Sequence, residues 1–506
     1  MSQEPTISAP RPLRFFHRGE IRSVQGLPAT LSVLSWLREH ARCTGTKEGC
    51  NEGDCGACTV LVGELHEGQL RFKPVNSCIQ FLPTLDGKAL LTVEDLGAAP
   101  VPDGADASPD GPRPHPAQQA MVDCHGSQCG FCTPGFVVSL AACYERHLAA
   151  GTEPTRTQLA DDLSGNLCRC TGYRPILDAG QRMFALPRRP LDGAAITAAL
   201  HTLAADPPLH YAGASAFHAP RGLDQFAALR AAKPQARLLA GNTDIGLWVN
   251  KQFRELGEVI HLGEVAELKA ITQAGGRLRI GAGASLEAAW DALARHWPPL
   301  REMGLRFASL PIREAGTMGG NLANGSPIGD SAPVLIALGA NLVLQRGLAQ
   351  RTVALDDFYT GYLQNRLLAG EFIEAIELAL PQPDEVMRAY KLSKRFDSDI
   401  SALACGLWLR LDGDRVADAR LAFGGLAATV CRASRAEAAL RGQRWDEGAL
   451  QAAAAALADD YQPLDDLRAS AGYRRRAAAA LLRRFWLETR PQQPLAGAEL
   501  SVWSRA

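Results

Sequence analysis

The sequence predicts a multidomain α+β protein arranged in four parts. Its 506 residues exceed what a single hydrophobic core usually supports. The pattern of the chain also changes along its length. Mixed strand- and helix-like segments come first, then helical segments, then alternating strands and helices, and finally two strand-like runs followed by Ala-rich helices. We therefore expect an α+β part, an all-α part, an α/β part and a second α+β part, in this order.

Bulk composition excludes several classes of partner. The net charge of −1 gives no reason to expect nucleic acid or an anionic membrane surface. No segment approaches the ~18 uninterrupted apolar residues that a membrane span needs. The N-terminus shows no charged and apolar regions of a secretory signal. The thirteen cysteines do not cluster as in a small disulfide-bonded protein. We expect a cytoplasmic protein with neither a nucleic-acid nor a membrane partner.

The first part reads as strands around a short helix. Residues 13–24 alternate enough to predict a hairpin. Thr30 is expected to cap a helix with leucines on one side. Strand-like runs follow at 59–62 and near 70–75. Together these elements predict an α+β fold that ends near residue 96.

Two connections separate the following parts. Residues 97–116 are rich in Pro, Gly and Asp and lack periodicity, which predicts an exposed linker or insertion. The next segment, 117–185, reads as helical, with a capping box from Thr155 to Gln158. A proline-bearing, Ala-rich stretch at 186–210 is the second connection.

The remaining chain alternates strand- and helix-like segments. The expected strands are 236–241, 276–283, 405–411 and 419–425, and the expected helices are 244–252, 285–296 and 473–485. The last helix is amphipathic, and its arginines are most simply a solvated face.

Eight of the cysteines form two quartets with different spacing. The first is Cys50, Cys55, Cys58 and Cys78, and the second is Cys129, Cys132, Cys168 and Cys170. The first quartet has the C-x4-C-x2-C spacing of plant-type [2Fe–2S] ferredoxins, followed by a distant fourth cysteine. Gly49, Gly53 and Gly56 allow the loop to wrap closely and aim backbone N–H groups at sulfur. Structural zinc, the alternative, usually uses two short C-x2-C pairs. The first quartet therefore predicts an iron–sulfur cluster.

The second quartet, C-x2-C with a later C-x-C, fits iron–sulfur or zinc by spacing alone. Thr133 is expected to cap a helix with Pro134 at its first position, and the positive end of this helix would point at an anionic cluster, which favours iron–sulfur. Pro175 is expected to open another helix. The cysteines outside both quartets are expected to be small buried apolar residues: Cys43, Cys124, Cys143, Cys405 and Cys431.

Four glycine-rich segments were considered as phosphate sites. The segment 281–286 lacks the third small residue of a dinucleotide fingerprint, and 241–246 lacks the lysine of a P-loop. In 238–245 a strand runs into a helix, and its amides with the Thr243 hydroxyl could hold a pyrophosphate. The segment 315–333 is glycine-dense and too polar for a core. Each of the last two is also compatible with a tight turn.

Five motifs in order resemble one family. They are GTKEGCNEGDCGACTV, GSQCGFCTPG, NLCRCTGYRP, LLAGNTDIG and AGTMGGNLANGSPIGD, and they resemble the iron–sulfur and flavin portions of xanthine dehydrogenases, members of the molybdenum hydroxylases. The chain resembles the small subunit (XdhA type) of bacterial two-chain enzymes. The resemblance implies a separate molybdopterin-binding large subunit, an (αβ)2 heterotetramer and NAD as electron acceptor.

The resemblance also implies domain boundaries. They are a ferredoxin-like [2Fe–2S] domain at 1–96, an all-α [2Fe–2S]-binding domain at 116–185, a linker at 186–210, an α+β FAD-binding domain of the vanillyl-alcohol-oxidase-like type at 211–382 and its C-terminal α+β subdomain at 385–495. The first cluster is implied to lie nearer the flavin, and the second nearer the molybdenum. Gln128 and Cys170 are implied to approach the pterin.

The implied FAD contacts are Leu238, Leu239, Ala240, Gly241, Asn242, Thr243, Asp244, Ile245, Phe307, Thr317, Gly319, Gly320, Asn321, Asp330, Ile376 and Lys391. The loop 392–401 matches the one that sets the electrostatics near the flavin, although its charge pattern differs from that of the animal enzymes. No side chain is implied as an acid–base catalyst. The implied activity is xanthine and hypoxanthine hydroxylation on the partner, with electrons passing through both clusters to FAD and NAD. Open alternatives are an aldehyde or N-heterocycle hydroxylase and a structural protein with zinc in both quartets.

Overall fold

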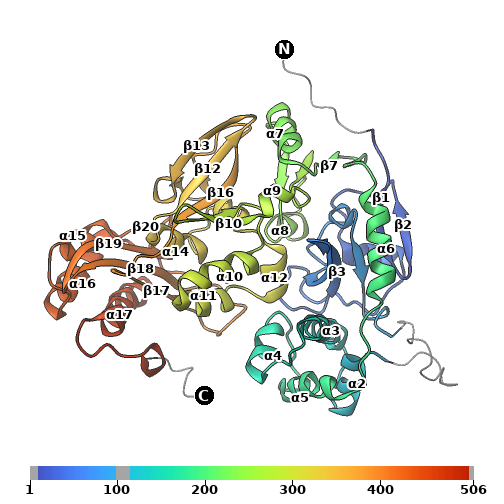
Figure 1. Ribbon diagram of the computed structural model, residues 1–506, viewed down its shortest axis with the longest axis horizontal. Helices are drawn as coiled ribbons and strands as arrows, with labels where there is room; N and C mark the ends of the chain where they lie inside the picture. The colour runs from blue at the N-terminus through green and yellow to red at the C-terminus, as the bar shows by residue number, and fades with distance from the viewer. Residues whose placement is uncertain (1–8, 98–113, 501–506) are drawn as a thin grey trace. The chain divides into compact units, whose positions relative to one another are not determined.

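The computed structural model describes residues 9–97 and 114–500 (Figure 1). Most of the linker expected at 97–116 lies outside the described residues. None of the described helices is both long and apolar enough to cross a bilayer.

The chain divides into two compact units. One comprises Met1–Ala266 with Ser309–Gly316, and the other comprises Glu267–Ala308 with Thr317–Ala506. The FAD-binding domain expected at 211–382 therefore contributes residues to both units. The domain boundaries themselves stay a prediction, and each unit is described by itself below.

The first unit opens with a five-stranded sheet. Its strands are β1 (Leu13–His17), β2 (Glu20–Val24), β3 (Thr59–His66), β4 (Gln69–Asn76) and β5 (Ala89–Leu91), in the order β2-β1-β5-β3-β4. β1 and β2 pair antiparallel from Leu13–Val24 to His17–Glu20, which confirms the expected hairpin. β1 and β5 pair in parallel. The expected strands at 59–62 and 70–75 are confirmed within β3 and β4.

The expected Thr30 cap was wrong by two residues. Helix α1 (Val33–Ser35) begins after Ser32, whose hydroxyl accepts from the Ser35 N–H, and it continues as a π-helical turn at Trp36–His40. Either hydroxyl could cap a helix, and only the backbone path selects Ser32. The 3₁₀ turn Leu82–Leu85 precedes β5.

The helical part of the first unit follows. It contains α2 (Pro116–Asp123), α3 (Thr133–Ala150), α4 (Arg156–Asp162), α5 (Arg174–Arg182), the 3₁₀ turn Met183–Ala185 and α6 (Gly193–Ala204). The capping box of Thr155 and Gln158 is confirmed, as is a proline in the first turn of α5. Thr133 was expected as the cap of α3. The N-cap position is instead held by Cys132, whose side chain makes no capping hydrogen bond, and the Thr133 hydroxyl lies 2.7 Å from that of Ser127.

One core joins the helices to the first sheet. Phe136, Leu140 and Tyr144 of α3 are buried in the same cluster as Phe16 of β1 and Leu61 of β3. Helix α3 packs against β3 and β4. The loops that precede β3 and α3, which carry five of the quartet cysteines, are therefore fixed to one rigid core.

A second, four-stranded sheet completes the first unit. Its order is β6-β7-β9-β8, with β7 and β8 both parallel to β9. The elements are β6 (Leu209–Tyr211), β7 (Phe217–Ala219), α7 (Leu223–Ala232), β8 (Arg237–Leu239), α8 (Ile245–Asn250), β9 (Val259–His261) and, from later in the chain, α12 (Leu310–Ala315). The expected strand 236–241 and helix 244–252 are confirmed as β8 and α8.

The second unit contains two larger sheets. The first has the order β10-β11-β16-β12-β13, and the second has the order β17-β18-β19-β20. Their strands are β10 (Ile271–Ala274), β11 (Arg277–Gly281), β12 (Asn341–Arg346), β13 (Ala349–Ala354), β16 (Phe372–Ala379), β17 (Glu385–Leu392), β18 (Leu403–Asp412), β19 (Arg415–Gly424) and β20 (Cys431–Arg432). The short strands β14 (Tyr359–Gly361) and β15 (Gln364–Asn365) form a separate two-stranded sheet.

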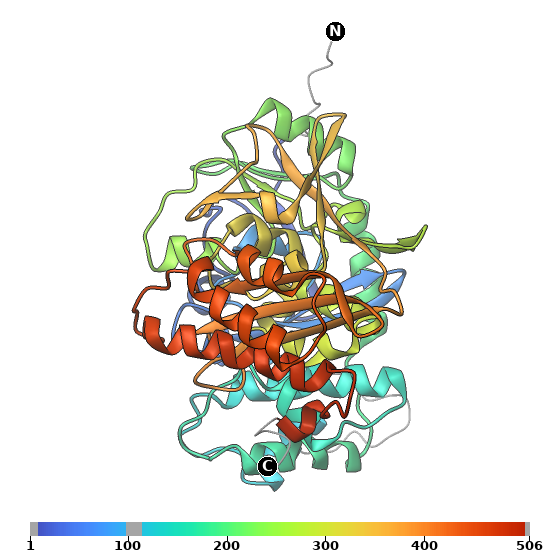
Figure 2. The same ribbon diagram turned by 90° about the vertical axis from the view of Figure 1, so that its left-hand side faces the viewer.

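Helices cover these sheets. They are α9 (Ala266–Lys269) at the boundary between the units, α10 (Leu286–His296), α11 (Arg301–Leu305), α13 (Met318–Asn324), α14 (Ser331–Ala337), α15 (Ser434–Leu440), α16 (Glu447–Asp460) and α17 (Ala471–Thr489). The 3₁₀ turns are Pro298–Leu300, Leu355–Asp357 and Gly497–Leu500. Figure 2 shows the C-terminal helices in front of the strands β17 to β20, and the apolar side chains between them form one buried cluster.

One arginine of the last helix was assigned to the wrong environment. Arg474 was expected on a solvated face, but it is 2% exposed. Its guanidinium donates to the carbonyls of Ala402 and Leu464 and to the Asp466 carboxylate. Arg475 and Arg476 are exposed as expected. A buried guanidinium needs such partners, since an unpaired charge in the interior is costly.

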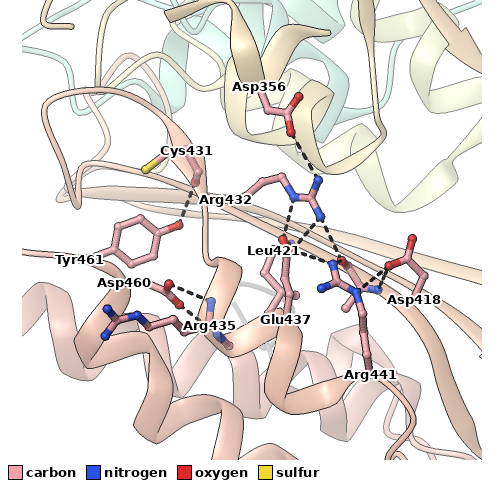
Figure 3. Close-up of polar contacts among 12 residues, drawn as sticks. Asp356, Asp418, Leu421, Cys431, Arg432, Arg435, Glu437, Arg441, Asp460 and Tyr461 are labelled. Atoms are coloured by element: carbon pink, nitrogen blue, oxygen red, sulfur yellow. Dashed lines mark hydrogen bonds and ion pairs between the residues drawn. The ribbon is translucent and has the colours of Figure 1, made fainter. Parts of the chain in front are cut away.

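A buried glutamate links β19, β20 and α15 (Figure 3). Glu437 is 1% exposed and accepts hydrogen bonds from the Leu421 N–H at 2.9 Å, from Arg432 at 2.7 Å and from Arg441 at 3.0 Å. Both arginines remain partly exposed and can be solvated by water. The buried carboxylate of Glu437 cannot, so its charge is stabilised only by these hydrogen-bond partners.

We expect Glu437→Ala to lower the free energy of unfolding by about 2–4 kcal/mol, because it leaves the buried Leu421 N–H without its acceptor and removes the buried charge partner of two guanidiniums. The midpoint of chemical denaturation, followed by tryptophan fluorescence, measures this change. Glu447→Ala, which removes an exposed carboxylate from the same subdomain, is the control and should shift the midpoint little. Equal shifts in the two variants would contradict this role of Glu437.

Candidate redox site

The first cysteine quartet converges from two segments. Cys50, Cys55 and Cys58 lie in the loop before β3, and Cys78 follows β4. Hydrogen bonds from Cys55 and Cys78 lower the pKa of the Cys50 thiol, and the same contacts raise the pKa of Cys55 and Cys78. The backbone N–H groups of Asp54 and Cys55 lie 3.4 and 3.3 Å from the Cys50 sulfur. Four converging thiols with backbone donors are the ligand set that a [2Fe–2S] cluster requires.

The loop around this quartet adopts left-handed backbone conformations at residues that tolerate them, an asparagine and a glycine. Asn51 adopts a φ of 54° and Gly53 a φ of 80°. The buried Asn76 side chain donates to the Gly53 carbonyl at 2.6 Å and so fixes the loop to β4. Asp54, the next residue, is not among the described residues with positive φ.

The second quartet converges from the start of α3 and the segment between α4 and α5. Hydrogen bonds pair Cys129 with Cys170 and Cys132 with Cys168. Burial and the neighbouring Cys168 raise the pKa of Cys132 to about 12. The Thr171 N–H and hydroxyl approach the Cys168 sulfur at 3.4 and 3.2 Å. Cys129 and Cys170 are exposed, so this quartet opens onto the surface of its unit.

The first quartet also touches the segment expected to bind the FAD pyrophosphate. Asn250, at the end of α8, donates to the Cys78 carbonyl at 2.8 Å, and Lys251 donates to the Cys50 carbonyl at 2.6 Å. Gln80 donates to the Gly241 carbonyl at 3.0 Å. The segment 238–251 therefore lies against the first quartet within one unit.

The segment 238–245 has features of a ligand-binding turn. Leu238 and Leu239 end β8, Ile245 begins α8, and Ala240–Asp244 form the turn between them. Asn242 is 3% exposed and, among the described residues, neither of its amide atoms has a hydrogen-bond partner. Buried polar groups are nearly always paired in native proteins. These two atoms therefore fit a polar ligand, and the residues present fit a phosphate-bearing cofactor.

Glycine is required at position 241 of this turn. A Cβ atom added there would lie 1.9 Å from the Ala315 carbonyl oxygen. The close approach holds the turn against the end of α12. Burial raises the pKa of the neighbouring Asp244 carboxyl.

The remaining FAD contacts expected from the sequence lie in the second unit. Thr317 caps α13, where its hydroxyl accepts from the Gly320 N–H at 3.1 Å, and Asn321 lies one residue further on. Gly319 is pressed against Ala282, so that an added Cβ would lie 2.4 Å from the alanine Cβ. This packing accounts for the glycine at position 319.

A buried ion pair holds two more of these residues together. The Lys391 ammonium lies 2.7 Å from one carboxylate oxygen of Asp330, and the Ser401 hydroxyl donates to the other at 2.6 Å. Phe307 is 7% exposed, and Ile376 is fully buried in the centre of the sheet, opposite Ile280 and Leu342. The FAD roles of all these residues remain predictions.

Some polar residues around these segments were not indicated by the sequence. Gln80, Asn250 and Lys251 are brought to the segments by folding, and no sequence pattern distinguishes them from other polar residues of helices and turns. Ser401, in contrast, ends the loop 392–401 that the resemblance places near the flavin.

A third cluster of potential ligands is structural. The polar atoms of Cys143, His147 and Asp162 lie within 4.8 Å of one another. Asp162 is paired with Arg146, and His147 contacts the Thr152 hydroxyl. Burial and the nearby Asp162 raise the pKa of the Cys143 thiol. The protonated Cys143 thiol and the Asp162 carboxylate, which is paired with Arg146, therefore have partners within the protein, and this cluster is explained without a metal ion.

Three family models match the chain. They are a [2Fe-2S] binding domain at 103–181, the FAD binding domain in molybdopterin dehydrogenase at 212–382 and the CO dehydrogenase flavoprotein C-terminal domain at 388–489. They bear out the expected fold class of iron–sulfur-binding, FAD-binding and C-terminal parts.

Known proteins are similar over most of the chain. Xanthine dehydrogenase of Drosophila subobscura is 30% identical over 94% of this chain and 39% of its own length. Aldehyde oxidase 4 of Cavia porcellus is 28% identical over 96% of this chain and 40% of its own. The chain thus spans about two fifths of these curated relatives.

Among solved structures, one chain of the reconstituted CO dehydrogenase from Oligotropha carboxidovorans matches with a TM-score of 0.50 and 30% identity. The match covers 53% of this chain and 94% of that one. The chain belongs to the molybdenum hydroxylase family. Within that family of oxidoreductases, it comprises the electron-transferring iron–sulfur and FAD portion.

We expect Gly241→Ala to lose most of the bound flavin, because the added methyl group collides with the Ala315 carbonyl and displaces the turn. The ratio of flavin to protein after gel filtration measures the loss. Gly193→Ala is the matched control, since its Cβ would meet only Leu70 at 3.6 Å. Full flavin content in Gly241→Ala would contradict the assignment of this turn.

Proposed function

We propose that this chain is the electron-transfer subunit of a xanthine dehydrogenase. Xanthine and hypoxanthine are hydroxylated on a partner subunit that holds the molybdopterin cofactor. Electrons enter this chain at the second quartet, pass to the first, and reach FAD and then NAD.

One observation carries the order of these sites. The segments of the first quartet contact both of their proposed neighbours. The Cys55 carbonyl accepts from the Leu167 N–H beside Cys168, and Gln80, two residues after Cys78, donates to the Gly241 carbonyl of the proposed FAD turn. The segments of the first quartet are thus hydrogen-bonded both to the segment of the second quartet and to the proposed FAD turn. The exposed Cys129 and Cys170 suit the second quartet for electron entry from a partner.

The chain's own residues bind and position the cofactors. The eight quartet cysteines hold two [2Fe–2S] clusters, and Asn242 and the amides of its turn hold the FAD pyrophosphate. Thr317, the glycines of α13 and the Asp330–Lys391 pair belong to the FAD contacts of the second unit. Bound FAD supplies the exchange between single electrons and a hydride.

We also propose a partner subunit, a cellular location and domain boundaries for this chain. The partner is a molybdopterin-binding large subunit in an (αβ)2 heterotetramer, with Gln128 and Cys170 facing the pterin. The location is cytoplasmic. The domain boundaries at 1–96, 116–185, 211–382 and 385–495 are part of the same proposal.

A second candidate is the equivalent subunit of an aldehyde or N-heterocycle hydroxylase. The observation that supports this candidate is the sequence identity of 28% to aldehyde oxidase 4 of Cavia porcellus, which is nearly as high as the 30% identity to a xanthine dehydrogenase. Turnover of xanthine and of aromatic aldehydes by the complete complex distinguishes the two, since one substrate class should be strongly preferred.

We expect Cys170→Ser to abolish xanthine turnover of the complex while sparing oxidation of NADH with an artificial acceptor, because only the entry cluster is lost. Both activities are measured on the same preparation. Cys124→Ser, which changes a cysteine outside both quartets, should leave both unchanged. Equal loss of the two activities in Cys170→Ser would contradict the proposed order of the sites.

A further inference from the structure

The loops of the two quartets are joined through their backbones. The Leu167 N–H donates to the Cys55 carbonyl at 3.0 Å. Leu167 directly precedes Cys168, so a bonded path runs from the Cys55 side chain through its carbonyl, across the hydrogen bond and along the backbone to the Cys168 side chain. This path connects a sulfur ligand of one quartet with a sulfur ligand of the other.

Asn166 fixes this contact from one side. Its side chain is 3% exposed, and its amide nitrogen donates to the Gly56 carbonyl at 3.1 Å and to the Thr59 hydroxyl at 3.2 Å. Its amide oxygen accepts from the Ser139 hydroxyl of α3 at 2.6 Å. One buried amide therefore binds the first cysteine loop, β3 and α3 at the same time.

Two glycines let the backbones come this close. Gly56 has a φ of 69°, and a Cβ added there would lie 2.1 Å from the Gly165 carbonyl oxygen. A Cβ added at Gly135 would lie 2.1 Å from the Gly56 carbonyl oxygen. The backbones of both loops and α3 thus meet around the Asn166 amide.

Neither an aspartate nor an apolar residue can replace the amide of Asn166. An aspartate would lack the two donors, and an apolar residue would remove the bridge from the Gly56 carbonyl and the Thr59 hydroxyl to Ser139 and leave the Ser139 hydroxyl without its amide acceptor. The Gly56 carbonyl would keep only the Thr59 N–H and hydroxyl as donors. The loops are then held together less tightly, which lengthens the Leu167–Cys55 contact.

We propose that Asn166 is a positioning residue that sets the electronic contact between the two clusters. This inference rests on the proposed function. In the step concerned, the cluster of the second quartet is oxidised by one electron and that of the first is reduced by one. No bond forms or breaks and no proton moves. Asn166 acts by holding the hydrogen-bonded path at a fixed length.

The test uses the full chain with both clusters assembled and dithionite as reductant. Freeze-quench EPR follows the two reduced clusters in time, and the spectrum of the fully reduced protein reports their magnetic interaction. In Asn166→Ala we expect both signals to be present, the interaction splitting to be weaker, and electron arrival at the first cluster to be severalfold slower.

Gln345→Ala is the matched control. It removes another buried amide that donates to a glycine carbonyl, that of Gly347 at 2.8 Å, but it lies in the second unit, which carries neither quartet. Its splitting and transfer rate should equal those of the wild type. An equal effect of both variants would overturn the role of Asn166.

A second variant covers the case in which Asn166→Ala loses a cluster. Ser139→Ala keeps the two amide donors and removes only the anchor of the amide oxygen, and we expect a smaller decrease in splitting and rate. Unchanged values in Ser139→Ala, or in a fully loaded Asn166→Ala, overturn the inference. Wild-type protein without two cluster signals would instead overturn the proposed function.

Discussion

The arrangement of the first unit depends on the backbone hydrogen bonds of the loop that carries Cys50, Cys55 and Cys58. Its carbonyls accept hydrogen bonds from the segment of the second quartet and from the end of α8. The sulfur of Cys50 receives N–H groups from the loop itself. A loop this constrained cannot shift without moving both of its neighbours. The arrangement of the proposed redox sites therefore follows from the packing of a few backbone groups.

Local signals in the sequence indicated the elements better than their junctions. The hairpin at 13–24 and the capping box of Thr155 follow from alternation and from one hydrogen-bond pattern, and both were correct. The spacing of the cysteines indicated the two quartets, whose thiols the structure brings together. Family membership is confirmed at the level of the molybdenum hydroxylases, whereas xanthine and NAD stay proposals.

Features that depend on distant segments could not be predicted. Arg474 lies in a helix whose pattern indicates an exposed arginine face, yet it donates to the carbonyl of Ala402, 72 residues away in the sequence. Asn166 opens the motif NLCRCTGYRP, but the motif does not indicate its three partners, which meet only after α3 packs on β3. The cap of α1 differs for a smaller reason, since Thr30 and Ser32 offer the same chemistry. For Arg474 and Asn166, tertiary contacts decide the position of the side chain, because buried polar groups must find partners.

The most direct test of two iron–sulfur clusters and a flavin on one chain is the metal and cofactor content of the anaerobically purified wild-type protein. The expected result is iron and acid-labile sulfide in equal amounts, bound FAD, visible absorption from both, and no zinc. A colourless protein, or zinc in place of iron in either quartet, would contradict the electron-transfer role.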